Sequence, residues 1–285
     1  MHLLRLYLSE QFLHCGKVHE KERRKKHMKY VLAANTQTGL KREINQDSLL
    51  IKSIICKGQQ MLLAVICDGM GGLQKGEVAS ASLVCAFAKW FEQEFPLIWG
   101  LEKNKVLLLK SWDEMIRKMS SKISDYGKKN RICLGTTLTA MLFTAEEYYI
   151  VHVGDSRVYR LKENTVQLTK DQTLMQWKLD EGILTKEEAE QRLEGSVLLQ
   201  CVGSSEEIKP VYIKGKIDKD TVYLLCSDGF YHMTDRREMY KYFGPECMKN
   251  EEAMEKNLLN FLRMLKARGE TDDISVITIR TRQEK

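Results

Sequence analysis

The sequence is poor in proline and contains no long apolar run. Only 3 prolines occur among its 285 residues, and no tract of biased composition is present, so a disordered linker is not predicted. No apolar stretch approaches the ~20 residues that a membrane-spanning helix requires. The sequence therefore predicts a globular, water-soluble protein that has no membrane partner.

Cysteine pairs at redox or metal-binding spacing are also absent. None of the 8 cysteines forms a Cys-x-x-Cys pair, and most lie inside apolar runs. Cysteines of this kind act as small core residues, which argues against a disulfide framework and against a zinc site. Because such cysteines are typical of a reducing compartment, we predict a cytoplasmic location.

The excess of positive charge is confined to one end of the chain. Residues 1–28 hold seven Lys or Arg and three acidic residues, whereas the rest has 38 basic and 36 acidic residues. A near-neutral body argues against nucleic acid as a partner. We interpret 1–28 as a basic N-terminal extension, which is a solvated tail, a binding arm, or the result of an upstream start before Met28. Residues 29–285 are predicted to form one domain.

The hydrophobic pattern predicts a mixture of strands and helices, in which strands cluster around hairpin-length turns. This clustering favours antiparallel sheets covered by helices, an α+β class, over an alternating parallel fold. Strands are predicted over Lys29–Asn35, Ser48–Ile55, Gln60–Cys67, Thr136–Phe143, Tyr148–Val153, Arg157–Leu161, Thr221–Ser227 and Ile274–Arg280. Helices are predicted over Lys75–Phe95, Lys105–Lys128, Thr173–Asp180, Thr185–Leu193, Asp235–Tyr242 and Asn250–Arg268.

Four predicted strands meet an aspartate at one end. Asp68 and Asp228 directly follow strands, Asp155 follows the strand that ends at Val153, and Asp272 lies just before the last strand. One such aspartate is usually a turn residue. In antiparallel sheets, however, the end of one strand lies beside the start of its neighbour, so Asp68, Asp228 and Asp272 are expected to converge. Three close carboxylates repel one another unless a divalent cation binds, and oxygen ligands suit Mg²⁺ or Mn²⁺.

Two further features point to phosphate chemistry. Arg42 lies five residues before Asp47 in a loop, and arginine forms bidentate hydrogen bonds with phosphate oxygens. Gly69 allows the backbone to come close enough for its carbonyl oxygen to reach a metal, while Gly71 and Gly72 allow a tight turn. Two cations sharing a carboxylate can hold a bridging hydroxide for in-line attack on phosphorus. The glycine-rich segment after Asp68 matches neither a dinucleotide-binding fingerprint nor a phosphate-binding P-loop.

Taken in order, these segments resemble the metal-dependent Ser/Thr protein phosphatases of type 2C, the PPM family, and most closely the bacterial stand-alone members. Each motif alone is weak, but their order and spacing match over nearly the whole chain from Met28. The matching segments are RxxxxD at Arg42–Asp47, DGMGGLQKGEVAS at Asp68–Ser80, GTT at Gly135–Thr137, GDSR at Gly154–Arg157, SDG at Ser227–Gly229 and TDDISVI at Thr271–Ile277.

The resemblance implies an αββα sandwich of two antiparallel sheets flanked by helices, with 29–285 as the catalytic domain. It implies that Asp68 bridges two Mn²⁺ or Mg²⁺ ions, that the Gly69 carbonyl binds the second ion, and that Asp228 and Asp272 complete the first. Asp47 is expected to hold metal-bound waters, and Arg42 the substrate phosphate. Asp155 matches a position that is linked in bacterial members to a third, weaker ion.

Some positions depart from the family pattern. Gln46 stands where many members have glutamate, which predicts an altered metal affinity. Gln172 stands where bacterial relatives often have histidine, and Asp273 where asparagine is common. Asp273 either adds charge beside the site or competes with Asp272 as a ligand. The segment Gln176–Glu207 should include the flap over the active site, and it matches the family least.

The predicted activity is hydrolysis of phosphoserine and phosphothreonine by direct attack of the bridging hydroxide, without a covalent phosphoenzyme. Cys67 and Cys226 lie beside the aspartates but inside apolar runs, and we reject them as nucleophiles. His152 and His232 are interpreted as structural. The predicted partners are phosphorylated proteins, the targets of a Ser/Thr kinase, and the predicted state is a monomer. The alternatives are a catalytically weak module that binds phosphoproteins or regulates a partner, and a two-metal phosphodiesterase or nuclease, which the neutral body disfavours.

Overall fold

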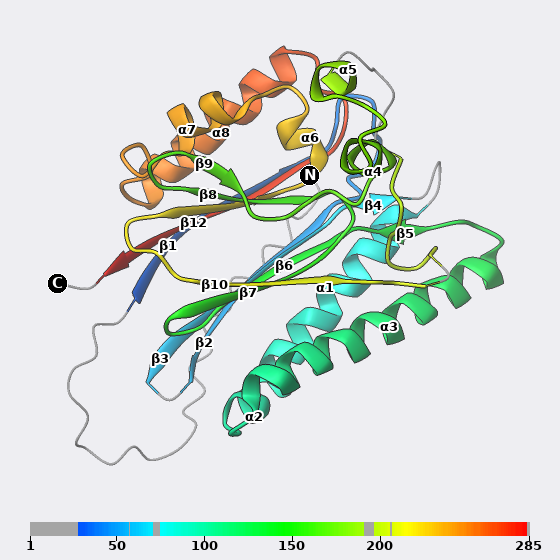
Figure 1. Cartoon of the computed structure of the whole chain (residues 1–285), viewed down its shortest axis with the longest axis horizontal. Coiled ribbons are helices and arrows are strands. Elements are labelled where there is room, and N and C mark those ends of the chain that lie inside the picture. Colours follow the sequence, from blue (N-terminus) through cyan, green and yellow to red (C-terminus); the bar gives the residue numbers. More distant parts are fainter. Residues whose placement is uncertain (1–27, 57, 71–74, 191–196, 206, 284–285) are drawn as a thin grey trace.

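The computed structural model describes residues 28–56, 58–70, 75–190, 197–205 and 207–283. Over these residues, two five-stranded antiparallel sheets pack face to face, and helices cover both outer faces (Figure 1). The predicted αββα sandwich is therefore confirmed. The predicted extension, apart from Met28, and the turn at Gly71 and Gly72 lie outside the described residues.

One sheet is covered on its outer face by two long helices. Its strand order is β10-β7-β6-β3-β2, and every neighbouring pair is antiparallel. Helices α1 and α3 lie along this face, and a short helix, α2, connects them (Figure 1). The bounds are β2 Ser48–Cys56, β3 Gln59–Cys67, β6 Leu138–Phe143, β7 Glu147–Val153, β10 Val211–Lys216, α1 Gly76–Gln93, α2 Phe95–Trp99 and α3 Asn104–Asn130.

The other sheet carries the C-terminal helices on its outer face. Its order is β1-β12-β11-β8-β9, again antiparallel throughout, so the first and last strands lie side by side. The bounds are β1 Met28–Gln37, β8 Arg157–Leu161, β9 Thr165–Gln167, β11 Val222–Cys226, β12 Ile274–Gln283, α6 Asp228–Tyr231, α7 Arg236–Phe243 and α8 Glu251–Ala267. A two-stranded ribbon pairs β4, Gly69–Met70, with β5, Gly135–Thr136.

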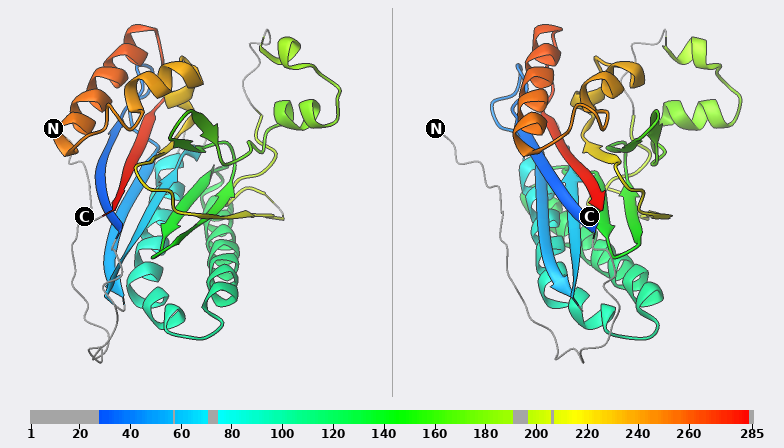
Figure 2. Two further views of the ribbon diagram at one scale, coloured as in Figure 1. Left: turned by 60° about the vertical axis from the view of Figure 1, so that its left-hand side comes forward. Right: turned by 90° about the vertical axis from the view of Figure 1, so that its left-hand side faces the viewer.

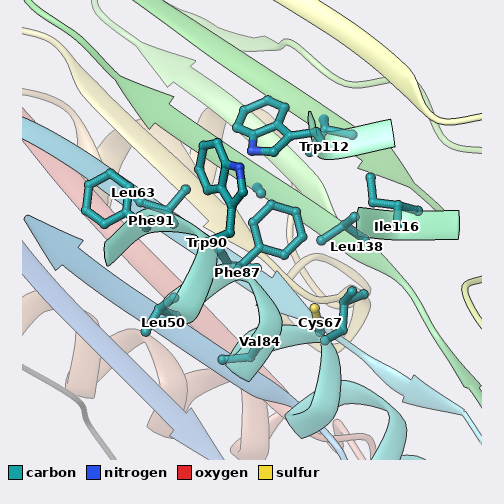
Figure 3. Packing of buried hydrophobic residues seen from close by; sticks show 14 of the residues in the cluster. Leu50, Leu63, Cys67, Val84, Phe87, Trp90, Phe91, Trp112, Ile116 and Leu138 are labelled. Atoms are coloured by element: carbon teal, nitrogen blue, oxygen red, sulfur yellow. The ribbon is translucent and has the colours of Figure 1, made fainter. Parts of the chain in front are cut away.

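Three apolar layers hold the sandwich together: one between the sheets and one beneath each pair of helices. In the layer under α1 and α3, Trp90 and Trp112 are fully buried with ring centroids 5.5 Å apart, and Phe87 packs on Trp112 (Figure 3). Under α8, Phe243 and Phe261 make an edge-to-face contact at 4.8 Å. Each such aromatic side chain stabilises the fold by ~1.5–3 kcal/mol, so both layers fix the sheets rigidly.

The segment between β9 and β10 extends away from the sandwich. It contains α4, Leu174–Asp180, and α5, Lys186–Glu190, and both views of Figure 2 show these helices projecting from the body (Figure 2). Backbone hydrogen bonds from Leu174 N to Val197 O and from Leu199 N to Gln172 O join its outgoing and returning chains, and the bond from Gln172 N to Gly154 O links it to the body. This segment corresponds to the predicted flap, part of which lies outside the described residues. None of the helices in the described ranges is long and apolar enough to cross a membrane.

All eight predicted strands and the main helices are confirmed within a few residues at their ends. One prediction of extent was wrong. The strand predicted over Thr136–Phe143 is split in two, because Thr137 turns its hydroxyl to the backbone N–H of Asp68 and leaves the sheet ladder. Helix α5 is described as far as Glu190, and the predicted continuation to Leu193 lies outside the described part of the chain.

Candidate metal and phosphate site

Strand register brings the predicted aspartates to one end of the sandwich. In the first sheet, Ser48 pairs with Cys67, so Asp47 and Asp68 flank the same rung. In the second sheet, Cys226 pairs with Val276 on one side and with Arg157 on the other. Asp228 therefore lies near both Asp272, which precedes β12, and Asp155, which precedes β8. The convergence predicted from antiparallel pairing is present in the structure.

Asp47 is a largely buried acid of this cluster. Its side chain is only 8% exposed, and its Oδ2 accepts a hydrogen bond from the Ser227 hydroxyl at 2.8 Å. Its Oδ1 is buried and has no hydrogen-bond partner. Burial raises the pKa of Asp47 to about 7. Hydrogen bonds from Ser275 and Ser227 act in the opposite direction, and repulsion from Asp273 and Asp228 raises the pKa further.

Asp68 and Asp228 face each other across the gap between the two sheets. Burial, followed by the charges of Asp47 and Asp228, raises the pKa of Asp68 well above its ordinary value. Burial also raises the pKa of Asp228, with Asp272 adding repulsion, while His232 and a hydrogen bond with Asp68 act in the opposite direction. The Oδ1 atom of Asp228 is buried and accepts no hydrogen bond. This cluster therefore stores unfavourable electrostatic energy that a cation can relieve.

Asp272 and Arg42 form an ion pair at the rim of this cluster. Arg42 donates to Asp272 Oδ1 from Nε at 3.0 Å and from Nη2 at 2.7 Å, and the backbone N–H of Asp273 donates to the same oxygen. The two side chains are 37% and 32% exposed. The predicted phosphate-binding residue and a predicted metal ligand are thus in direct contact.

Asp273 holds the loop that carries Arg42. Its Oδ1 accepts a hydrogen bond from Gly39 N and its Oδ2 accepts one from Gln46 N, both at 2.8 Å. The residue is only 4% exposed. Of the two roles predicted for Asp273, the competing ligand is the one these contacts disfavour, because both oxygens already accept backbone amides and neither faces an open position.

Gly69 sits where three backbone segments meet. Its N–H donates to Gln46 O at 3.1 Å, and a Cβ at this position would overlap both Gln46 O and Gly76 O. The side-chain Oε1 of Gln46 would in turn lie 2.9 Å from a Cβ on Gly76. Only glycine permits this approach at the position next to Asp68, and the role predicted for its carbonyl oxygen as a metal ligand stays a prediction.

Asp155 lies deeper in the structure, and its loop is braced by Gln172. Asp155 is 4% exposed, and its charge contributes to the raised pKa of Asp68 after the larger effects of burial, Asp47 and Asp228. Gln172 accepts a hydrogen bond from Gly154 N through its Oε1 at 2.7 Å and donates its own N–H to Gly154 O. Gln172 therefore acts as a support for the loop that presents Asp155.

The donor set of this cluster suits divalent cations. Buried carboxylate oxygens without hydrogen-bond partners, on Asp47 and Asp228, together with mutual repulsion among the acids, are what a hard cation compensates. Within the described residues, no three His, Cys, Asp or Glu side chains already have the arrangement of a complete metal-binding set. Because Arg42 holds Asp272 Oδ1, a cation bound through that oxygen would have to displace the arginine.

Histidine and cysteine side chains near the cluster have structural contacts. His152 is fully buried between Thr139 Oγ1 at 2.9 Å and Lys170 O at 3.2 Å, and burial lowers its pKa to about 4. Cys67 and Cys226 pack in the two outer apolar layers, and burial raises the pKa of both thiols. Neither thiol is therefore an activated nucleophile, as predicted.

Two residues near the cluster were not assigned a role from the sequence. His232, interpreted from the sequence as structural, caps the C-terminus of the short helix α6, which was not predicted because four residues are too few to show helical periodicity. It contacts Asp228 and Glu270. Glu270 was not singled out at all. No spacing in the sequence links these positions, so no signal could have found their contact.

Comparison with known proteins agrees with the fold and the motifs. A family model described as protein phosphatase 2C matches residues 40–263. The serine/threonine protein phosphatase PstP of Mycobacterium tuberculosis is 35% identical over 200 residues, which is 69% of this chain and 35% of the relative. The serine/threonine phosphatase stp of Listeria monocytogenes is 27% identical over 230 residues, 76% of this chain and 83% of the relative.

A solved structure agrees over a greater length. The catalytic domain of PstP, crystallised with two manganese ions, superposes with a TM-score of 0.72 at 27% identity and covers 90% of this chain and 99% of that domain. The chain belongs to the protein phosphatase 2C family. It spans about a third of the full length of the mycobacterial relative and most of the length of the Listeria relative.

Proposed function

We propose that this protein is a metal-dependent serine/threonine protein phosphatase, which removes phosphate from phosphoserine and phosphothreonine in proteins. The observation that carries the proposal is the cluster of Asp47, Asp68 and Asp228 at one end of the sandwich, in which burial and mutual repulsion raise the pKa of each acid. Strongly perturbed acids gathered in this way are typical of a catalytic site. The relatives named as serine/threonine phosphatases support the substrate class.

In this proposal, Asp68, Asp228 and Asp272, with the backbone carbonyl of Gly69, are ligands of two divalent cations, Mn²⁺ or Mg²⁺. When bound, such a pair supplies Lewis-acid charge and an activated water for in-line attack on phosphorus. The manganese ions in the PstP structure support Mn²⁺. The proposal includes a third, weaker ion at Asp155, which the charge that Asp155 adds beside Asp68 supports.

The remaining residues would position the substrate and water. Asp47, which accepts a hydrogen bond from Ser227 through Oδ2, has a buried Oδ1 without a hydrogen-bond partner and would orient water with it. Arg42 presents a planar guanidinium at the exposed rim, where it can exchange Asp272 for the phosphate of a substrate. The negative charge beside Arg42 is then supplied by the substrate phosphate, because the Asp272 carboxylate would now bind the cations.

The wider biological setting rests on the family. We propose that the substrates are targets of a Ser/Thr kinase, that the protein acts as a monomer in the cytoplasm, and that residues 29–285 are its catalytic domain. Cys67, Cys85, Cys133, Cys201, Cys226 and Cys247 form no disulfide, which agrees with a reducing compartment.

The test is hydrolysis of a phosphothreonine peptide by purified protein in Mn²⁺, in Mg²⁺ and in EDTA. Activity should require the metal and should fall by at least ~10³-fold in Asp228→Asn. Asp113→Asn, which changes an acid on the exposed face of α3 that pairs with Arg117, is the matched control and should keep full activity. Folded protein without turnover in either metal would contradict the proposal and would favour a phosphoprotein-binding module.

A further inference from the structure

Glu270 lies in the turn between α8 and β12, directly before the residues that form the acidic rim. Its Oε1 accepts a hydrogen bond from Thr271 N at 2.7 Å and another from Asp272 N at 2.9 Å. The residue is only 4% exposed. A buried carboxylate that accepts two consecutive amides fixes the backbone of that turn. Glu270 therefore fixes the backbone of Asp272, which is the point of attachment of its side chain.

His232 connects this turn to the other side of the cluster. It caps α6, and its ring reaches Asp228 through Nε2, which lies 3.5 Å from Oδ2, and Glu270 through Nδ1, which lies 3.6 Å from Oε2. Asp228 is the first residue of α6, so one helical turn separates it from His232. The ring thus spans the space between a carboxylate of the cluster and the carboxylate that holds the next turn.

We infer that Glu270 and His232 form a positioning pair that sets the distance and orientation between Asp228 and Asp272, the two acids proposed to share one cation. The inference rests on the proposed function, since it concerns the ligands of that metal. The two acids come from separate elements, α6 and the turn before β12. In the described part of the chain, Asp228 contacts His232, His232 contacts Glu270, and Glu270 accepts a hydrogen bond from the backbone N–H of Asp272.

The backbones that carry Asp228 and Asp272 approach each other closely at Gly229. Gly229 packs so tightly against the backbone of Asp273 that a Cβ there would overlap its carbonyl oxygen. The start of α6 and the turn are therefore pressed together, but this backbone contact does not define where the two side chains point. The pair, which touches Asp228 on one side and the amide of Asp272 on the other, supplies that definition. Support of this kind is worth ~10–100-fold in metal affinity.

The different chemistry of the two residues allows positioning to be separated from electrostatics. Removing the negative Glu270 would weaken cation binding by charge alone, whereas removing His232, which carries no negative charge, would not weaken it by charge alone. If both residues act by position, both losses weaken binding. In Glu270→Gln, an amide oxygen can still accept the two backbone bonds while the charge is lost.

The experiment is calorimetric titration of Mn²⁺ into wild-type protein, Glu270→Ala, Glu270→Gln, His232→Ala and the double Ala variant, together with the Mn²⁺-induced rise in melting temperature. Circular dichroism establishes that each variant is folded. Glu238→Ala is the matched control, because Glu238 pairs with Arg268 beside the same turn but does not contact Asp228 or Asp272.

Glu270→Ala is expected to weaken Mn²⁺ binding by ~10–100-fold and His232→Ala by ~10-fold. Glu270→Gln should recover to within ~3-fold of wild type, and the double variant should be no weaker than Glu270→Ala, because the two residues act as one unit. Unchanged binding in folded Glu270→Ala, tighter binding in His232→Ala, or Glu270→Gln as weak as Glu270→Ala would overturn the inference. Failure of the wild-type protein itself to bind Mn²⁺ would instead contradict the proposed function.

Discussion

Arg42 places two nitrogen atoms on a single oxygen of Asp272, at 3.0 and 2.7 Å, and so joins the loop after β1 to the turn before β12. The same arginine is the candidate phosphate ligand and the same aspartate a candidate metal ligand. Asp272 Oδ1 can bind a cation only after Arg42 leaves it, and the same two nitrogen atoms of Arg42 can bind phosphate only after leaving Asp272. The ion pair therefore links cation binding to the availability of the phosphate-binding group.

This relationship predicts opposite effects of Arg42→Ala on two measurements. Loss of the guanidinium should lower kcat/KM for a phosphopeptide by ~10–100-fold, since hydrogen bonds to a charged group are lost. Mn²⁺ binding, measured by calorimetry, should become ~2–5-fold tighter, because an exposed ion pair no longer competes for Asp272. Lys41→Ala, which removes a neighbouring exposed charge, is the control. Weaker Mn²⁺ binding in Arg42→Ala would show that the arginine supports the metal site instead.

The buried acid Asp47 predicts a pH-dependent stability of the protein in EDTA. Its pKa is raised from 3.8 to about 7 by burial first, so the folded state binds this proton more tightly than the unfolded chain. The free energy of unfolding should thus fall as the pH rises from about 4 to about 7, by up to ~1.4 kcal/mol per pH unit for one proton. Urea unfolding at pH 5, 6, 7 and 8 measures this slope.

Asp47→Asn is the matched variant for that experiment, since its amide oxygen can still accept from Ser227. Between pH 5 and pH 7, Asp47→Asn should remove the contribution of one proton, ~1.4 kcal/mol per pH unit, from the slope of the free energy of unfolding against pH. Saturating Mn²⁺ should flatten the slope of the wild-type protein as well, because a bound cation favours the ionised acids. Equal slopes for the wild-type and variant proteins in EDTA would mean that Asp47 is ionised throughout this range.

Close backbone packing at Gly69 predicts a large cost for a single methyl group. Gly69→Ala should lower the free energy of unfolding by ~1–3 kcal/mol, because the new Cβ overlaps the carbonyl oxygens of Gln46 and Gly76. Gly100→Ala is the comparison, since its Cβ would meet no atom closer than 3.4 Å, and its stability should change by less than ~0.5 kcal/mol. Chemical denaturation measures both, and a well-tolerated Gly69→Ala would contradict the packing described.

His152 provides a test of the division between structural and metal-site residues. His152→Leu should destabilise the protein by ~1–3 kcal/mol, because Thr139 and the Lys170 carbonyl lose a buried partner. Mn²⁺ affinity should stay within ~2-fold of wild type, since this ring contacts none of the clustered aspartates. A large loss of Mn²⁺ affinity in folded His152→Leu would place the histidine in the metal site.

The sequence was sufficient for the parts of the fold that have a strong local pattern. β3 and β11 are runs of buried apolar residues that end at an aspartate, and antiparallel pairing then brings those ends together. β10 was missed because it is an edge strand with an exposed outer side and includes Lys214, Gly215 and Lys216. An apolar run was not available there to signal a strand.

Within the candidate site, residue types at strand ends could be predicted, but their partners could not. The acids that gather at one end follow from register, which the strand boundaries already imply. The attachment of Asp273 to two loop amides and the contact between His232 and Glu270 depend on how turns pack in three dimensions. Short turns carry no periodicity, so these contacts are visible only in the structure.

The most direct test of the account is the position of manganese in a crystal of this protein grown with Mn²⁺. Anomalous scattering recorded at the manganese edge should show two strong peaks on either side of the Asp68 carboxylate, one of them also beside Asp228 and Asp272, with Arg42 turned away from Asp272. Peaks remote from Asp68, or a metal-free cluster in protein that hydrolyses a phosphopeptide, would contradict the proposed site.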